Sequence, residues 1–534
     1  MTDQKGSVCI VLHTHLPYVN HPEHDDFLEE DWLFEAITET YLPLVFIMND
    51  LWTDKVPFRL TFSMTPPLIH MLRSPILMAK FEKYLDKRIE LADLEVKRQA
   101  GDRLRLESAR HYQLRFGQMR EFFHACNGDI TAGFRRFAEL GLIEIIASAA
   151  THGFLPLFES DTAVRAQIAL GVELHKDTFG VAPKGFWLPE CAYRPGMDAL
   201  LLEHGIEYTI LDTHGLTGAE PTPDTQSFRP IKTRAGLTAF GRDAECSQQI
   251  WSSVVGYPGD PDYRELYRDI GYDADYRFIK PFLKQDGVRR NIGMKYHRIT
   301  GDVPLHEKEL YSPSVARERA ATHAGNFLFN RGEQIKHQNG ILNEPICITA
   351  PFDTELFGHW WYEGPWFLEE MFRQAAEIGD EATFDLCTPS EVMAKNETTP
   401  TAEIGACSWG EDGFYKVWLN DKNQWFWPHL HQMEERMALL AKRDFPKDSL
   451  AARILRQMGR ELLLAQSSDW SFILTMETST WYAEKRFRDH VHRFFALEDL
   501  LDESAPNTDL LDTWEKQDAI FPNLDYRLFA SQAK

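Results

Sequence analysis

The stretch Ala350-Pro-Phe-Asp-Thr-Glu-Leu-Phe-Gly-His-Trp-Trp-Tyr-Glu-Gly364 decides how the rest of the chain is interpreted. Residues 346–352 are apolar and predict a buried strand. Polar and aromatic side chains follow at once, from Asp353 onward. Aromatic rings can stack on the apolar faces of sugars, and carboxyl groups can do acid–base chemistry at a glycosidic oxygen. The stretch therefore favours a strand that ends in a carbohydrate site over a loop packed by its own aromatic side chains.

Seven apolar runs of this kind alternate with helical patterns, and most of them end in polar residues. They lie at residues 8–18, 58–64, 142–148, 184–190, 207–211, 237–243 and 346–352. Parallel α/β barrels have this alternation, and their active sites are built at the carboxyl ends of the strands. The sequence therefore predicts an α/β protein with a parallel barrel.

Two further parts complete the predicted organisation. A charged helical pattern at 69–126 is too long for one crossover helix, so we expect a helical insertion at about residues 80–130. After a soft boundary at 396–401, helical patterns predict a C-terminal helical domain. The predicted domains are residues 1–400 and 401–534.

The composition of the chain limits which classes of partner the protein can bind and where in the cell it is expected. The net charge of −24 argues against nucleic acid or an anionic membrane as a partner. The seven cysteines are scattered, so buried thiols are expected instead of bridges or metal ligands. No apolar run reaches the roughly 18 residues of a membrane span, and the start of the chain lacks a signal-peptide pattern. We expect a cytoplasmic protein.

Two strands of the predicted barrel end in a carboxyl group. Glu190 follows one of them and Asp353 the other, each with aromatic residues close by. Cleavage or transfer at a glycosidic bond needs two carboxyl groups that flank the bond, which makes this pair the catalytic candidate. For Glu190, a structural ion pair with Arg194 is the alternative.

Histidines cluster at or just past the ends of three strands. They are His13, His15, His152 and His214. Together with Asp212 they could hold a divalent metal, because imidazole and carboxylate suit zinc or manganese. They could equally donate hydrogen bonds to sugar hydroxyls, and each taken singly could be an ordinary buried histidine.

Five segments resemble the signature sequences of glycoside hydrolase family 57, and most closely those of its 1,4-α-glucan branching enzymes. They are His13-Thr-His-Leu-Pro-Tyr18, Thr151-His-Gly153, Phe186-Trp-Leu-Pro-Glu190, Asp353-Thr-Glu-Leu-Phe-Gly-His-Trp-Trp361 and Ser467-Ser-Asp-Trp470. The resemblance implies a distorted, TIM-like (β/α)7 barrel with a helical insertion and a C-terminal helical domain that completes the substrate cleft. It also implies catalysis without a metal or other cofactor.

Carried over residue by residue, the resemblance implies that Glu190 is the nucleophile and Asp353 the acid/base, with Glu355 in support. Trp418 fits a place in the core equally well. The implied or expected substrate-binding residues are His13, His15, Trp32, His152, Trp187, Asp212, His214, Trp251, Trp360, Trp409, Trp418, Asp469 and Trp470.

The implied activity is that of a hexosyltransferase. It cleaves an α-1,4 bond of a linear glucan with retention and passes the chain to a 6-hydroxyl, which creates an α-1,6 branch as in glycogen synthesis. Donor and acceptor would both be linear α-1,4-glucan, and the protein would be a monomer or small homo-oligomer. One departure concerns Phe228, which stands where a loop tyrosine that shields the intermediate is expected.

Other activities remain open at this point. An α-amylase or a 4-α-glucanotransferase of the same family would use the same carboxyl pair. A metal-dependent hydrolase, deacetylase-like or mannosidase-like, would use His13, His15 and Asp212. A glucan-binding protein without catalysis is the third possibility.

Overall fold

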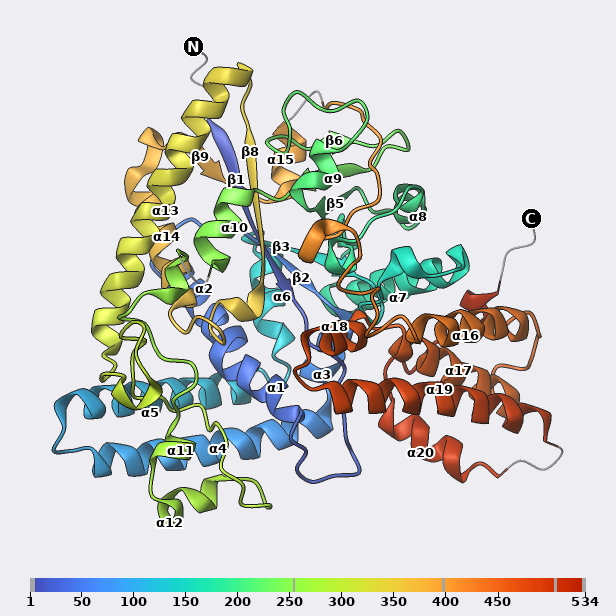
Figure 1. Ribbon diagram of the computed structural model, residues 1–534, viewed down its shortest axis with the longest axis horizontal. Helices are drawn as coiled ribbons and strands as arrows, with labels where there is room; N and C mark the ends of the chain where they lie inside the picture. Colours follow the sequence, from blue (N-terminus) through green and yellow to red (C-terminus); the bar gives the residue numbers. More distant parts are fainter. Residues whose placement is uncertain (1–4, 253–254, 396–398, 504–506, 531–534) are drawn as a thin grey trace.

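The computed structural model describes residues 5–252, 255–395, 399–503 and 507–530. All seven predicted strands are present in a parallel sheet, in the order β7-β5-β4-β3-β2-β1-β8 (Figure 1). Nearly every residue in these strands is buried, as expected where helices cover the outer face of a parallel sheet and side chains fill the inside. The strands are β1 Gly6–Thr14, β2 Leu60–Met64, β3 Ile143–Ser148, β4 Gly185–Trp187, β5 Tyr208–Leu211, β7 Thr238–Gly241 and β8 Cys347–Asp353.

The sheet curls so that its two ends meet. A parallel bridge joins Arg242, just after β7, to Thr349 in β8, and the Asp243 amide donates to the Thr349 carbonyl at 2.8 Å. Two strands were not predicted: β6 Ile231–Lys232 runs antiparallel to β7, and β9 Phe384–Leu386 pairs with β1. The predicted distorted barrel is confirmed.

Helices cover the outside of the barrel. In α7, the Ser160 side chain accepts from the Ala163 amide at the start, and Gly180 ends the helix with φ +76°. Gly171 brings α7 against β3, since a Cβ there would lie 1.9 Å from the Ser148 carbonyl oxygen. The barrel helices are α1 Glu30–Ala36, α2 Leu42–Thr53, α3 Pro66–Leu72, α6 Thr131–Glu139, α7 Asp161–Phe179, α8 Met197–Glu203, α9 Thr213–Thr217, α10 Ala244–Trp251, α13 Pro313–Leu342, α14 Gly364–Ile378 and α15 Pro389–Lys395.

The helical insertion is a hairpin of α4 Pro75–Arg98 and α5 Arg103–Ala125, which lie side by side in Figure 1. A long excursion that carries the short helices α11 Ile270–Asp273 and α12 Tyr276–Ile279 rests on this hairpin. Tyr112 of α5 accepts from the Lys295 amide at 3.1 Å, and Tyr296 donates to Glu95 of α4 at 2.8 Å. The insertion and the excursion therefore pack together as one unit beside the barrel.

Helices also make up the end of the chain, at the right of Figure 1. They are α16 Phe426–Leu440, α17 Leu450–Ala465, α18 Ser468–Met476, α19 Thr480–Asp502 and α20 Asp509–Gln517. An isolated bridge of Tyr193 with Cys407 ties the segment before these helices to the barrel, and a second, of Gly153 with Ser467, ties the junction of α17 and α18 to it. Part of the predicted boundary, residues 396–398, lies outside the described residues, and the division at 400 stays a prediction.

Among the described residues, no helix is both long and apolar enough to cross a membrane.

Candidate active site

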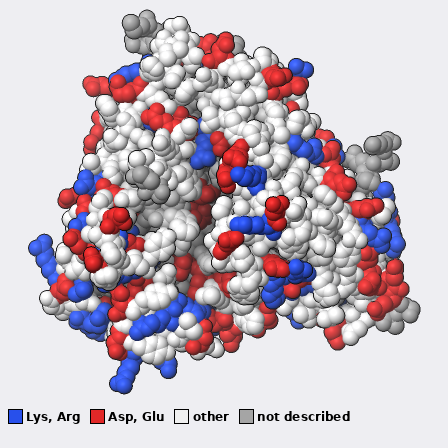
Figure 2. Space-filling view, viewed as in Figure 1, with Lys and Arg blue, Asp and Glu red and all other residues white. Residues whose placement is uncertain are grey.

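A pocket of about 380 Å³ lies at the carboxyl ends of the strands, between the barrel and α18. Figure 2 shows this face hollowed near its centre, with acidic side chains in the hollow. Ten residues predicted for the site line the pocket. They are His13, His15, His152, Glu190, Trp251, Asp353, Trp360, Trp409, Trp418 and Asp469.

Glu190 stands in a strained turn three residues beyond β4. Its φ is +63°, which is uncommon for any residue other than glycine and is typical of functional sites. Its Oε2 accepts from Trp409 Nε1 at 2.6 Å, and its Oε1 accepts from Ser468 Oγ at 2.8 Å. Burial raises the pKa of Glu190 to about 7, although both donors act in the opposite direction. The carboxyl group is thus held from two sides.

Asp353 is the last residue of β8 and pairs in register with His13 of β1. Burial raises the pKa of Asp353 to about 6, and Arg242 and His15 oppose that shift. Because both carboxyl groups line one pocket and titrate near neutrality, the pair can hold one proton, as acid-and-nucleophile chemistry requires.

Glu355 lines the same pocket but is tied to the fold. Its Oε1 accepts from the Tyr41 hydroxyl at 2.5 Å and from the His15 amide at 3.3 Å. Burial raises its pKa to about 7. These contacts suit a supporting carboxyl group that fixes the end of β1.

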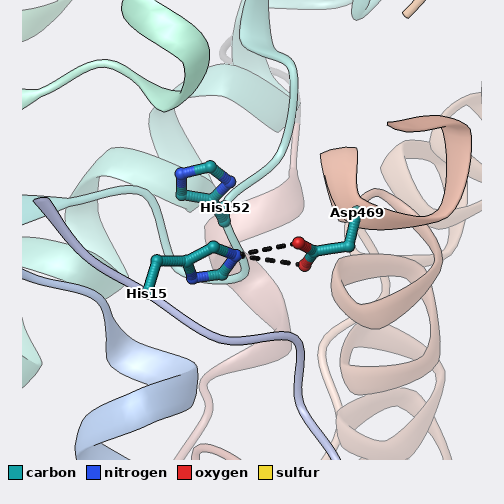
Figure 3. A group of neighbouring side chains, drawn as sticks. All are labelled: His15, His152 and Asp469. Carbon is teal, nitrogen blue, oxygen red and sulfur yellow. Dashed lines mark hydrogen bonds and ion pairs between the residues drawn. The ribbon is translucent and has the colours of Figure 1, made fainter. Parts of the chain in front are cut away.

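Three histidines form a stacked group above β1 and β3. His15 Nε2 lies 3.0 and 3.1 Å from the two carboxylate oxygens of Asp469, which reaches in from α18 (Figure 3). The rings of His15 and His152 stack with centroids 3.8 Å apart, and His13 Nε2 lies 2.9 Å from His152 Nε2. Burial lowers the pKa of His13 and His152 well below the usual range. For His15, burial also acts downward, but Asp469 makes the net pKa shift upward.

His15, His152 and Asp469 are close enough to be considered as a metal site. The donor atoms are already engaged, however: His15 Nε2 by Asp469, and the two ring nitrogens of His152 by His13 and Ser468. The geometry therefore fits a hydrogen-bonded group of imidazoles better than a cation cage.

The structure does not bring together the residues of the alternative metal set, His13, His15 and Asp212. Asp212 does not line the pocket; it caps α9 by accepting from the Thr213 amide at 2.6 Å and pairs with Arg242 at 3.4 Å. It is therefore occupied at the start of α9 and does not join the histidines.

Four tryptophans line the pocket with very different exposure. The side chains of Trp360 and Trp251 are 57% and 38% exposed, so their faces are free to stack on a ligand. Trp409 is half-buried and holds Glu190. Trp418 is 1% exposed and stacks on Phe154 at 4.9 Å, which favours the core role for most of its ring.

Five residues predicted to bind substrate lie outside the pocket. Trp187 is buried beneath His13, with stacked rings 4.4 Å apart, and it supports that imidazole. Trp470 is buried and donates to the Leu464 carbonyl at 2.8 Å. Trp32 packs edge-on against Tyr482. The His214 ring hydrogen-bonds the Gly413 carbonyl, and Asp212 caps α9.

Phe228 is not a loop residue at the mouth of the site. Its carbonyl accepts from the Cys347 amide at 2.7 Å, at the start of β8. Asp353 lies six residues further along this strand, or about 20 Å at 3.3 Å per residue. This distance from Asp353 argues against the match of Phe228 to a shielding tyrosine.

Sequence reasoning missed several side chains of the site. Ser468 and Arg242 contact or face the carboxyl pair, and Glu411, Phe472 and Met476 line the pocket. Ser468 stands inside a quoted motif and Arg242 at the end of a predicted strand, so position could have suggested both. Nothing in the sequence pattern distinguishes the other three from ordinary helix and loop residues.

Comparisons with known proteins cover nearly the whole chain. Residues 9–405 match the family model of glycosyl hydrolase family 57, and residues 429–529 match that of the 1,4-alpha-glucan branching enzyme C-terminal region. A 1,4-alpha-glucan branching enzyme of Thermococcus kodakarensis is 34% identical over 92% of this chain and 73% of its own length.

Two solved structures have the same fold from end to end. The alpha-amylase AmyC of Thermotoga maritima is 42% identical with a TM-score of 0.92, over 99% of this chain and 100% of that one. A branching enzyme of Pyrococcus horikoshii is 33% identical with a TM-score of 0.88, over 99% and 98%. One of these proteins is an alpha-amylase and the other a branching enzyme, and this chain shares the fold of both.

Proposed function

The chain belongs to glycosyl hydrolase family 57, and we propose that it is a 1,4-alpha-glucan branching enzyme. The observation that carries the proposal is the pair of buried carboxyl groups, Glu190 and Asp353, in one pocket between the barrel and α18. The match of residues 429–529 to a branching-enzyme region supports it, since α18 from that region holds Glu190.

In the proposed mechanism, Asp353 protonates the oxygen of an α-1,4 bond while Glu190 attacks the anomeric carbon. The cut chain is then held as a glycosyl ester on Glu190. Asp353, now ionised, takes the proton of an incoming 6-hydroxyl, whose oxygen displaces Glu190. Two inversions give net retention and an α-1,6 branch.

The surroundings suit each step. Trp409 and Ser468 hydrogen-bond the two oxygens of Glu190 and hold its orientation. The exposed faces of Trp251 and Trp360 would stack on glucose rings beside the cleavage point. Linear α-1,4-glucan is the proposed donor and acceptor, and the cytoplasm the proposed location.

An α-amylase is the second candidate, because the 42% identical structure is that of an alpha-amylase. Both enzymes would form the same ester and differ in whether water or a sugar hydroxyl resolves it. The test incubates the purified protein with amylose and follows iodine staining, reducing ends and isoamylase-sensitive branches. Transfer is supported if the colour is lost, few reducing ends form and isoamylase-sensitive branches appear. A rise of reducing ends that matches the loss of colour, without branches, means hydrolysis.

A further inference from the structure

Four side chains form an unbroken row of hydrogen bonds that ends on Glu190. Ser63 Oγ lies 3.1 Å from His13 Nδ1, and His13 Nε2 lies 2.9 Å from His152 Nε2. His152 Nδ1 lies 2.8 Å from Ser468 Oγ, which donates to Glu190 Oε1 at 2.8 Å. The row joins β2, β1, the loop after β3 and the start of α18. We call Ser63, His13, His152 and Ser468 the serine–histidine relay.

We propose that, in the active enzyme, each hydrogen bond of the relay is donated in the direction of Glu190, from Ser63 at one end to Ser468 at the other. Ser63 and Ser468 are then positioning residues for this nucleophile. The proposal rests on the function proposed above, in which Glu190 attacks as a carboxylate. The two serines would act through their hydroxyl protons and would not touch the reacting sugar.

The direction follows from counting protons, starting at the carboxylate. An ionised carboxylate only accepts, so the single hydroxyl proton of Ser468 is donated to Glu190. The Ser468 oxygen must then accept from His152, which places the His152 proton on Nδ1. A neutral imidazole has one proton, so His152 Nε2 accepts from His13 Nε2. His13 Nδ1 is left bare and accepts from the Ser63 hydroxyl.

Both imidazoles are in surroundings that keep them neutral. His13 and His152 are each 2% exposed, and burial lowers the pKa of both well below the usual range. Trp187 stacks under His13 and His15 stacks on His152, so neither ring can turn without losing a stacked neighbour. The tautomers are therefore set by the hydrogen bonds and the ring planes by the packing.

The relay has a consequence for the proton shared by the carboxyl pair. A proton on Oε1 of Glu190 would face the Ser468 hydroxyl proton, and a proton on Oε2 would compete with the Trp409 N–H. The relay thus favours an ionised Glu190 and opposes the effect of burial, which places the pKa of Glu190 at about 7, above the value of about 6 for Asp353. Bond cleavage needs the shared proton on Asp353, which is the state that the relay stabilises. The other charged or titratable groups that face Glu190 or line its pocket are His15, Asp353, Glu355, Asp469, Arg242 and Glu411.

The test compares Ser468→Ala and Ser63→Ala with the wild type, with Ser468→Thr and Ser63→Thr as hydroxyl-keeping controls. Turnover of amylose is measured as total bond cleavage across pH, so the result does not depend on whether transfer or hydrolysis follows. Ser468→Ala should move the acid limb of kcat/KM upward by about one to two pH units, because a donor to a charged group is lost. Ser63→Ala should move it in the same direction by less, and the threonine variants should return it.

An acid limb that stays in place in both alanine variants would overturn the proposal, even if kcat fell, because a merely structural serine would not move it. Since a core variant can fail to fold, the second measurement uses the wild type: nitrogen NMR with labelled histidine above the acid limb. The expected tautomers are a proton on Nε2 of His13 and on Nδ1 of His152; the opposite pair refutes the relay. Failure of the function itself is recognised separately, by full turnover in Glu190→Gln.

Discussion

Replacing Glu190 by glutamine tests how much the buried, ionised Glu190 lowers the free energy of unfolding. Glu190 is 8% exposed, and burial raises its pKa from 4.5 to about 7. At about 1.4 kcal/mol per pKa unit, the ionised group lowers the free energy of unfolding by about 3 kcal/mol. Glutamine carries no charge but matches only one of the two donors, Trp409 and Ser468, so about 1 kcal/mol is lost again. The net expected gain is about 2 kcal/mol once Glu190 is ionised in the wild type.

The gain has a defined pH window. The folded pKa of Glu190 lies above the unfolded value, so the wild type loses stability as pH rises from about 4.5 to about 7 and no further above that. Glu190→Gln does not titrate there. Its advantage should therefore be absent at about pH 4 and complete at about pH 8.5.

The assay is the unfolding midpoint by scanning calorimetry at both pH values, beside the amylose assay, in which the variant should lose nearly all turnover. With an unfolding entropy of about 2 cal/mol/K per residue, 2 kcal/mol corresponds to roughly 2 °C for a 534-residue chain. Glu318→Gln, an exposed change on α13, is the matched control and should shift nothing. A midpoint difference for Glu190→Gln that is the same at both pH values would refute the reasoning.

Three further outcomes are expected. The wild-type pH profile of kcat/KM should be a narrow bell, which falls in acid as Glu190 takes a proton and in alkali as Asp353 loses one. The apparent pKa values of its two limbs should lie near 6 and 7 and belong to the pair of carboxyl groups together. A flat profile between pH of about 5 and 8 would contradict this expectation. Trp360→Ala should raise KM for long glucans about tenfold without lowering the unfolding midpoint, whereas Trp52→Ala, exposed but outside the pocket, should leave KM alone. Asp518→Ala should lower the free energy of unfolding by about 3–5 kcal/mol in denaturant titrations, because the buried Arg486 and the half-buried Arg493 lose their carboxylate partner. A change under about 1 kcal/mol would show that the pairing is not needed.

The barrel could be predicted because its strands are long apolar runs with polar ends. All nine residues of β1 are buried, so the run stands out whichever face is considered. The same polar ends identified Glu190 and Asp353 as neighbours, because parallel strands bring their carboxyl ends to one side. β6 and β9 were not predicted because they are short and only partly buried, whereas β4, also three residues long, is fully buried and stands within a longer apolar run.

The fine division of the aromatic residues could not be predicted. Trp187, Trp360 and Trp470 are the same residue type in similar motifs, yet one is 57% exposed and two are almost fully buried. The burial of Trp187 depends on the His13 ring that stacks on it from a distant strand, and such contacts are not visible in the local sequence. Ser468 was missed for the same reason: its partner Glu190 lies 278 positions earlier in the chain.

That separation in sequence also determines when each part of the site becomes present during synthesis of the chain. Glu190 leaves the ribosome long before Ser468, and at about 5–20 residues per second the wait is roughly 14 to 56 seconds. The barrel cannot close before β8, Cys347–Asp353, has been made. From then until α18 emerges, Glu190 lacks the hydroxyl donor of Ser468, and His15 lacks the Asp469 carboxylate. We therefore expect a growing chain to acquire the capacity to cut a glucan only with the helices that close the cleft.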